Sequence, residues 1–253
     1  MIDSKINLAT LSKIDGFSWP IQLALIDMFC RCVEPANALE IGTWHGRSGV
    51  ILATYVNEKY GIYYGIEPDP QRADITYNNC GIVCPNGHVY VEKNISTNSQ
   101  LLERHQPWLN IVHIDGEHTF NAVYNDLNIV KPLMLRDGII ILDDFFFDMY
   151  PQITQAVFKW LDQNPDWTLL CVGSCKGFLC NKISYKKYAD MILDESFITE
   201  LKKYDTYFTD ISITKTSPIS DCLTIGITTN ISKDNYVGNE CDSNGRVEKI
   251  VAI

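Results

Sequence analysis

Short apolar segments recur between residues 38 and 142 and predict the strands of a buried sheet. Each is rich in Ile, Val or Leu, which is typical of strands that are covered on both faces of a parallel sheet. The predicted strands are Ala38–Ile41, Ile62–Ile66, His88–Glu92, Asn110–Ile114 and Ile139–Leu142.

Amphipathic segments predict helices before and between these strands. Pro20 suits the first turn of a helix that runs to Val33. A second predicted helix, Phe120–Leu135, is followed by Gly138, which suits the left-handed position after a helix end. A third is Ile153–Leu161. Strands that alternate with helices in this way predict an α/β fold with a doubly wound, mostly parallel sheet.

The pattern changes toward the C-terminus. Trp167–Val172 and Phe178–Cys180, joined by a turn over residues 173–177, predict a closing antiparallel hairpin. Two short helices and two strands are expected beyond it: Tyr185–Leu193, Ser196–Lys203, Thr206–Lys215 and Asp221–Thr229. Because about 70 residues bury little on their own, we expect residues 183–253 to be a C-terminal appendage of one domain that spans residues 1–182.

Composition and charge narrow the functional class. Of the 253 residues 46% are hydrophobic, which is enough for a packed core, and the net charge is −10. This acidic balance argues against nucleic-acid or anionic-membrane partners, which need clustered Lys and Arg. Residues 1–10 do not resemble a secretory leader, and nine scattered cysteines make a poor disulfide framework. We therefore expect a cytoplasmic protein with reduced cysteines; the sequence is compatible with a homo-oligomer.

Two glycines follow the first predicted strand, in the sequence Glu40-Ile41-Gly42-Thr43-Trp44-His45-Gly46-Arg47-Ser48. They permit a tight turn close to a ligand, and Ser48 suits the N-cap of the next helix. The G-x-x-x-G spacing differs from the G-x-G-x-x-G of dinucleotide sites, so an NAD-dependent dehydrogenase is a weaker alternative. The carboxylate of Glu40 favours a cationic ligand over a pyrophosphate.

Polar side chains follow the other strands, at the edge where open parallel sheets bind ligands. Glu67 follows the second strand, where a carboxylate can accept both hydroxyls of a ribose. Asn94 and Ser96 follow the third strand and suit an adenine edge. The fourth and fifth strands end at Asp115-Gly116-Glu117-His118 and Asp143-Asp144. Three carboxylates and an imidazole in one crevice predict a hard divalent cation.

Together these motifs resemble the class I methyltransferases that use S-adenosylmethionine, over about Pro20 to Asn181. Within this group the chain is most similar to metal-dependent O-methyltransferases that act on sugar and polyketide hydroxyls of natural products. The motifs that carry the resemblance are Ala38-Leu39-Glu40-Ile41-Gly42 with Gly46-Arg47-Ser48, His113-Ile114-Asp115-Gly116-Glu117-His118, and Gly138-Ile139-Ile140-Ile141-Leu142-Asp143-Asp144-Phe145.

The resemblance implies a Rossmann-like fold and methyl transfer to a small-molecule hydroxyl, assisted by a divalent metal, which we expect to be Mg²⁺. The residues expected to bind S-adenosylmethionine are Glu40, Gly42, Thr43, Gly46, Ser48, Glu67, Asn94, Ser96 and Asp115. The expected metal ligands are Asp115, Asp143 and Asp144, and the expected general base is His118. The alternatives are a metal-free or N-directed methyltransferase, and a non-catalytic cofactor-binding partner in a biosynthetic assembly.

Overall fold

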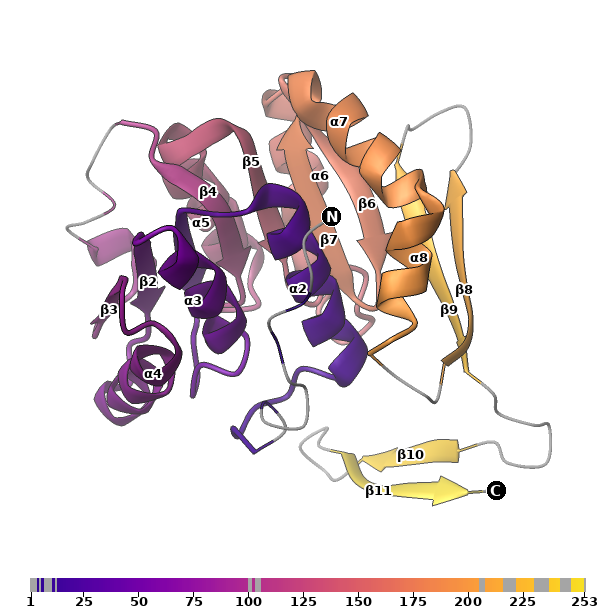
Figure 1. The fold of residues 1–253 in the computed structure, drawn as a ribbon, viewed down its shortest axis with the longest axis horizontal. Helices are drawn as coiled ribbons and strands as arrows, with labels where there is room; N and C mark the ends of the chain where they lie inside the picture. Colours follow the sequence, from indigo (N-terminus) through magenta and orange to yellow (C-terminus); the bar gives the residue numbers. More distant parts are fainter. Residues whose placement is uncertain are drawn as a thin grey trace.

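A nine-stranded mixed sheet with helices on both faces forms the body of the protein (Figure 1). The computed structural model describes residues 4, 6, 11, 13–99, 102, 106–204, 208–215, 222–229, 237–241 and 247–252. The strands of the large sheet are β1 (Asn37–Ile41), β2 (Ile62–Ile66), β3 (His88–Glu92), β4 (Leu109–Ile114), β5 (Met134–Leu142), β6 (Trp167–Gly173), β7 (Lys176–Asn181), β8 (Phe208–Lys215) and β9 (Leu223–Thr229). A second, two-stranded sheet pairs β10 (Val237–Cys241) with β11 (Val247–Ala252).

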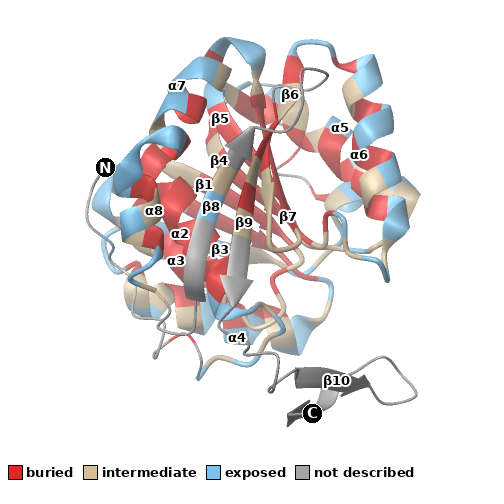
Figure 2. Ribbon diagram, turned by 90° about the vertical axis from the view of Figure 1, so that its right-hand side faces the viewer, coloured by how far each residue is buried: buried red, intermediate tan, exposed pale blue. Residues whose placement is uncertain are grey.

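The helices are α2 (Pro20–Val33), α3 (Gly49–Glu58), α4 (Pro70–Val83), α5 (Phe120–Val130), α6 (Pro151–Gln163), α7 (Lys182–Leu193) and α8 (Glu195–Leu201). The helices cover both faces of the sheet, and each face has its own hydrophobic core (Figure 2). Residues of α2, α3, α4, α7 and α8 share one core, and residues of α5 and α6 share the other. Successive residues of β5 alternate between them: Ile139 and Ile141 face the first core, whereas Ile140 and Leu142 face the second.

The order of the strands confirms the predicted doubly wound sheet. The order is β3-β2-β1-β4-β5-β7-β6-β9-β8, and β3 to β5 run parallel. Because β1 lies between β2 and β4, the order in which strands are added to the sheet reverses at β1. Ligands bind such sheets beside this point, at the carboxyl ends of the strands. The predicted hairpin is also present, since β7 runs antiparallel to both β5 and β6.

Two local predictions are wrong. The helix predicted to end at Leu135 ends at Val130, and Gly138 lies within β5. Pro132 explains the early end, because it lacks an N–H and disfavours a continuing helix; residues 131–133 form a 3₁₀ turn instead. The five-residue turn predicted between β6 and β7 is a tight turn over Ser174 and Cys175, both left-handed with φ +48° and +58°.

The described residues beyond 182 continue the same core and sheet. Arg31 of α2 forms an ion pair of 2.9 Å with Glu200 of α8, and Asp27 of α2 accepts a hydrogen bond from Tyr204. β9 adds to the sheet by pairing with β6. The predicted strands at 206–215 and 221–229 correspond to β8 and β9, although Thr206 and Asp221 lie outside the described residues.

Other sequence-based expectations concern the membrane and the cysteines. Among the described residues, no helix is both long and apolar enough to cross a membrane. Of the eight cysteines whose side chains are described, all except Cys175 are buried. Burial as small apolar side chains is therefore confirmed for these seven.

Candidate functional site

The glycine loop after β1 packs directly against the end of β4. Gly42 is left-handed, with φ +82°, and a Cβ there would lie 2.0 Å from the carbonyl oxygen of Asp115. The Asp115 N–H donates to Ile41 O at 2.8 Å. Gly46 is also left-handed, with φ +80°. Only glycine lets this loop approach Asp115 so closely, and a ligand above the loop would meet backbone rather than side chain.

Glu67 lies at the carboxyl end of β2 and supports the same loop. Its Oε2 accepts the N–H of Trp44 at 2.9 Å, and its Oε1 accepts the N–H of Asp69 at 3.1 Å. A carboxylate has about four lone-pair positions, so two remain for other donors. A pair of ribose hydroxyls would satisfy them.

Glu40 and three neighbouring side chains form a buried network beneath the loop. Its Oε1 accepts from Ser48 Oγ at 2.5 Å and lies 2.8 Å from His113 Nδ1, and its Oε2 accepts from Tyr63 Oη at 2.6 Å. Glu40 is fully buried. Ser48 occupies the N-cap position of α3, but its side chain does not cap the helix as predicted, because its hydroxyl is directed at Glu40. Thr43, in the loop itself, is buried and forms a 3.0 Å hydrogen bond with Thr76.

The segment after β3 carries the residues predicted to meet adenine. Ser96 Oγ donates a hydrogen bond to the carboxylate of Asp126 on α5. Asn94 is held in a turn, where its Nδ2 donates to Asn98 O at 3.0 Å. Asp126 is buried, and this desolvation raises its pKa to about 6. No sequence pattern singled out Asp126, because an acid on the inner face of a helix has no local signature.

Asp115, His118 and Asp144 come together at the ends of β4 and β5. His118 Nε2 lies 3.6 Å from Asp115 Oδ1 and 3.3 Å from Asp144 Oδ2. The distance to Asp115 is too long for a hydrogen bond and the geometry toward Asp144 is unsuitable for one, so this buried nitrogen has no hydrogen-bond partner among the described residues. The imidazole stacks on the Tyr150 ring, with the centroids 4.2 Å apart. Asp144 is left-handed, with φ +51°, which helps to turn two consecutive acids toward one site.

These charges perturb one another. The carboxylates of Asp115 and Asp144 raise the pKa of His118, since they stabilise its protonated form. Burial and the nearby charge of Asp143 raise the pKa of Asp115. Burial acts in the same direction on Asp143, but the ammonium of Lys176 outweighs it and lowers the pKa of Asp143.

Lys176 is another site residue that the sequence analysis did not identify. It is fully buried at the start of β7, and its Nζ lies 2.5 Å from Asp143 Oδ2 and 3.4 Å from His113 Nε2. In the sequence it belonged to the predicted turn, and His113 had no evident partner. A lysine in a turn is ordinarily solvated. Only the pairing of β5 with β7 shows that Lys176 lies beside Asp143.

Two overlapping groups of donors have spacings suited to a metal ion. One contains Asp115, His118 and Asp144, and the other contains His113, Asp115 and Asp143. In the first, the unpartnered His118 Nε2 faces two carboxylates, which fits a bound cation. In the second, Lys176 already supplies a positive charge.

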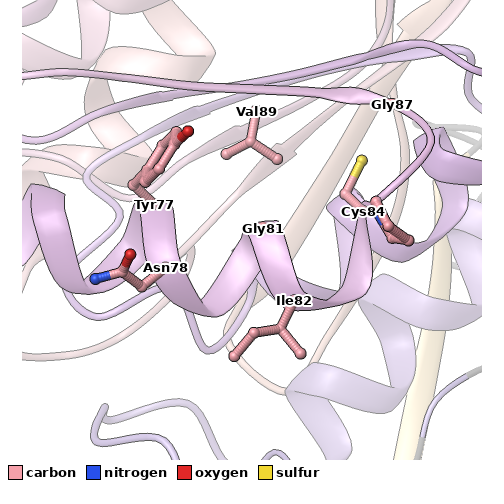
Figure 3. A pocket seen from close by; sticks show the side chains of 8 residues that line it. Tyr77, Asn78, Gly81, Ile82, Cys84, Gly87 and Val89 are labelled. Atoms are coloured by element: carbon pink, nitrogen blue, oxygen red, sulfur yellow. The ribbon is translucent and has the colours of Figure 1, made fainter.

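A separate surface pocket lies elsewhere on the protein. Its lining comes from α4, the start of β3 and the loop between them, and includes Tyr77, Ile82, Cys84 and Val89 (Figure 3). This is the amino end of β3, whereas Asp115, Asp144 and the glycine loop lie at the carboxyl ends of the strands. The pocket is therefore not part of the candidate site.

The sequence and the fold were compared with known proteins. Residues 39–145 match a family model described as a methyltransferase domain. This segment includes the glycine loop, Glu67, His118 and both acids after β5. A comparison with curated proteins gave no match.

Solved structures share the fold at low sequence identity. An O-methyltransferase from Bacillus cereus, in complex with SAH, is 19% identical with a TM-score of 0.53, over 68% of this chain and 85% of that chain. The O-methyltransferase TomG from Streptomyces achromogenes, involved in tomaymycin synthesis and in complex with SAM, is 18% identical with a TM-score of 0.54, over 70% and 91% of the two chains. The resemblance to class I methyltransferases is thus confirmed.

Proposed function

We propose, from the match of residues 39–145 to a methyltransferase domain and from the fold shared with O-methyltransferases, that this chain transfers a methyl group from S-adenosylmethionine to a hydroxyl of a small molecule. The observation that carries the proposal is the unpartnered Nε2 of His118, which lies between two carboxylates on the same sheet edge as the glycine loop. This nitrogen is a proton acceptor beside the place where the fold family holds its cofactor.

The cofactor is proposed to lie over the carboxyl ends of β1, β2 and β4. Glu67 accepts the two ribose hydroxyls with the lone pairs that the Trp44 and Asp69 N–H groups leave free. Gly42 and Gly46 let the loop backbone approach the methionine part, and Asp115 attracts its ammonium and sulfonium charges. Asn94 and Ser96 line the adenine side.

Glu40, Ser48 and Thr43 act from below the loop. Glu40 is fully buried and accepts hydrogen bonds from Ser48 and Tyr63, so it holds the base of the loop in place. Thr43 ties the loop to α4 through Thr76. We propose that these residues contribute to cofactor binding by fixing the loop.

His118 is proposed as the general base. It removes the proton of the acceptor hydroxyl at Nε2, and the oxygen then attacks the methyl carbon of the sulfonium as the C–S bond breaks. Asp115 and Asp144 stabilise the imidazolium that forms, and the Tyr150 ring fixes the plane of the imidazole. Holding acceptor and methyl donor in line accounts for much of the rate enhancement.

Asp115 and Asp144 are the residues proposed to hold a divalent ion, such as Mg²⁺. Both carboxylates lie close to His118, and oxygen donors suit hard cations, so an ion held by their oxygens would leave Nε2 of His118 to act as the base. When bound, such an ion would acidify and orient the acceptor hydroxyl. Asp143, the third acid expected from the sequence, is paired with Lys176 and is treated separately below.

The acceptor is proposed to be a natural product of the sugar or polyketide type. This rests on the resemblance of the strand-end motifs and on the fold shared with TomG. Tyr150, which stacks on His118, and Phe147, whose ring packs edge-on against Tyr150, offer an aromatic surface for such a molecule.

The experiment incubates purified protein with S-adenosylmethionine bearing a labelled methyl group and a panel of hydroxylated and aminated small molecules. O-methylated product that disappears with chelator and returns with Mg²⁺ supports the full proposal. Turnover that survives exhaustive chelation favours the metal-free alternative, and N-methylated product favours the N-directed one. Tight cofactor binding without turnover of any acceptor favours the non-catalytic partner.

A further inference from the structure

The buried cation Lys176 is not explained by the proposed reaction alone. It joins a line of polar side chains that crosses the sheet from β1 to β7. Glu40 Oε1 meets His113 Nδ1 at 2.8 Å, His113 Nε2 meets Lys176 Nζ at 3.4 Å, and Lys176 Nζ meets Asp143 Oδ2 at 2.5 Å. An ammonium can only donate hydrogen bonds, so Nε2 accepts from Lys176 and the ring proton of His113 lies on Nδ1, facing Glu40.

Strand pairing places Lys176 at this position. β7 runs antiparallel to β5, and Leu142 pairs with Gly177. The first residue of β7 therefore lies beside the residue that follows β5, and these two residues are Lys176 and Asp143. The turn before Lys176 is fixed as well, because Phe145 N–H donates to Cys175 O at 2.9 Å.

Both oxygens of Asp143 are engaged. Oδ2 accepts from Lys176, and Oδ1 accepts the N–H of Asp144 at 2.8 Å. A divalent ion bound to Asp143 would lie next to a fixed positive charge in a desolvated place, where like charges repel strongly. Asp144 and Asp115 have no such ammonium within ion-pair distance among the described residues.

We propose that Lys176 is a positioning residue that acts as the built-in counter-charge of Asp143 and withholds this acid from the metal. The inference rests on the proposed function, since it concerns the same metal site. The donor set for a divalent ion is then formed by Asp115 and Asp144 near His118. Asp143 instead supports the site from below, by holding the Asp144 backbone.

The test measures Mn²⁺ binding by calorimetry, without cofactor or acceptor. Lys176→Met removes the ammonium and keeps an unbranched side chain of similar length, so Asp143 becomes available to the ion. We expect Lys176→Met to bind Mn²⁺ at least about tenfold more tightly than the unaltered protein, in line with the 10–100-fold effects of residues around metal ligands. A gain in affinity is an effect that general structural damage does not produce. Affinity equal to or below that of the unaltered protein overturns the proposal.

A second variant covers the case in which Lys176→Met does not fold because Asp143 is left buried and unpaired. The double variant Asp143→Asn with Lys176→Met removes both charges, and replacing a whole buried pair is often tolerated. We expect it to bind Mn²⁺ as the unaltered protein does, within about threefold, whereas the matched change Asp144→Asn weakens binding at least about tenfold. A double variant that loses as much affinity as Asp144→Asn contradicts the proposal.

The outcome is separable from that of the proposed function. If the unaltered protein binds no Mn²⁺ but Lys176→Met does, Lys176 blocks the metal and the metal-assisted part of the proposed function fails. If neither binds, the role of Lys176 is overturned. Failure of methyl transfer itself would be seen in turnover with S-adenosylmethionine, which the Mn²⁺ series does not use.

Discussion

The buried acid Asp126 gives a quantitative prediction about stability and pH. Its carboxylate accepts a hydrogen bond from Ser96, but burial outweighs this and raises its pKa from 3.8 to about 6. A raised pKa means that folding favours the protonated form. The contribution of Asp126 to stability is therefore fully present below pH 3.8 and is lost as the pH rises through about 6.

The size of the effect follows from the shift. One pKa unit corresponds to about 1.4 kcal/mol, so a shift of roughly two units lowers the free energy of unfolding by about 3 kcal/mol at pH 8. At pH 4.5 most of this penalty is absent, and about 1 kcal/mol remains. Asp126→Asn keeps the shape and an oxygen acceptor for Ser96, but it does not ionise.

The assay is urea unfolding of the unaltered protein and of Asp126→Asn between pH 4.5 and pH 8. We expect the free energy of unfolding of the variant, relative to the unaltered protein, to rise by about 2 kcal/mol over this range. The control is Asp190→Asn, because the exposed pair of Asp190 with Lys186 contributes little. Parallel pH profiles for Asp126→Asn and the unaltered protein would refute the reasoning.

Three further predictions concern the site. Gly42→Ala should destabilise the fold by about 2 kcal/mol or more in urea unfolding, because φ is +82° and the new Cβ meets Asp115 O. The control is Gly81→Ala in α4, which should be neutral or stabilising because a Cβ has open space there. A similar loss of stability in the control would contradict the steric argument. Glu67→Ala should weaken S-adenosylmethionine binding by about 1.5–3 kcal/mol in calorimetry, and unchanged affinity would exclude the ribose role. His118→Ala should retain cofactor binding but turn over about 10²–10⁴-fold more slowly, with partial recovery at higher pH; an unchanged rate would remove the base role.

Part of the site could be derived from the sequence because it depends on local order along the chain. Runs such as Ile62–Ile66 are short and apolar, so they predict buried strands wherever they pair. Parallel strands then bring their carboxyl ends to one edge, which predicts that Glu67, Asp115 and Asp144 share that edge without knowledge of the strand order. The glycine loop after β1 and the acids after β4 and β5 could be predicted for the same reason, because each directly follows a strand in the sequence.

The charge balance of the site was decided only by tertiary structure. Lys176 reaches Asp143 because β7 enters the sheet antiparallel beside β5, in a register that pairs Leu142 with Gly177. His113 and Glu40 are 73 positions apart in the sequence, and they meet because β4 lies next to β1. Local periodicity fixes which face of a strand a side chain occupies, but not which strand lies next to it. The sequence alone therefore determined where the acids gather, and the packing of distant strands determined which of them already has a cation.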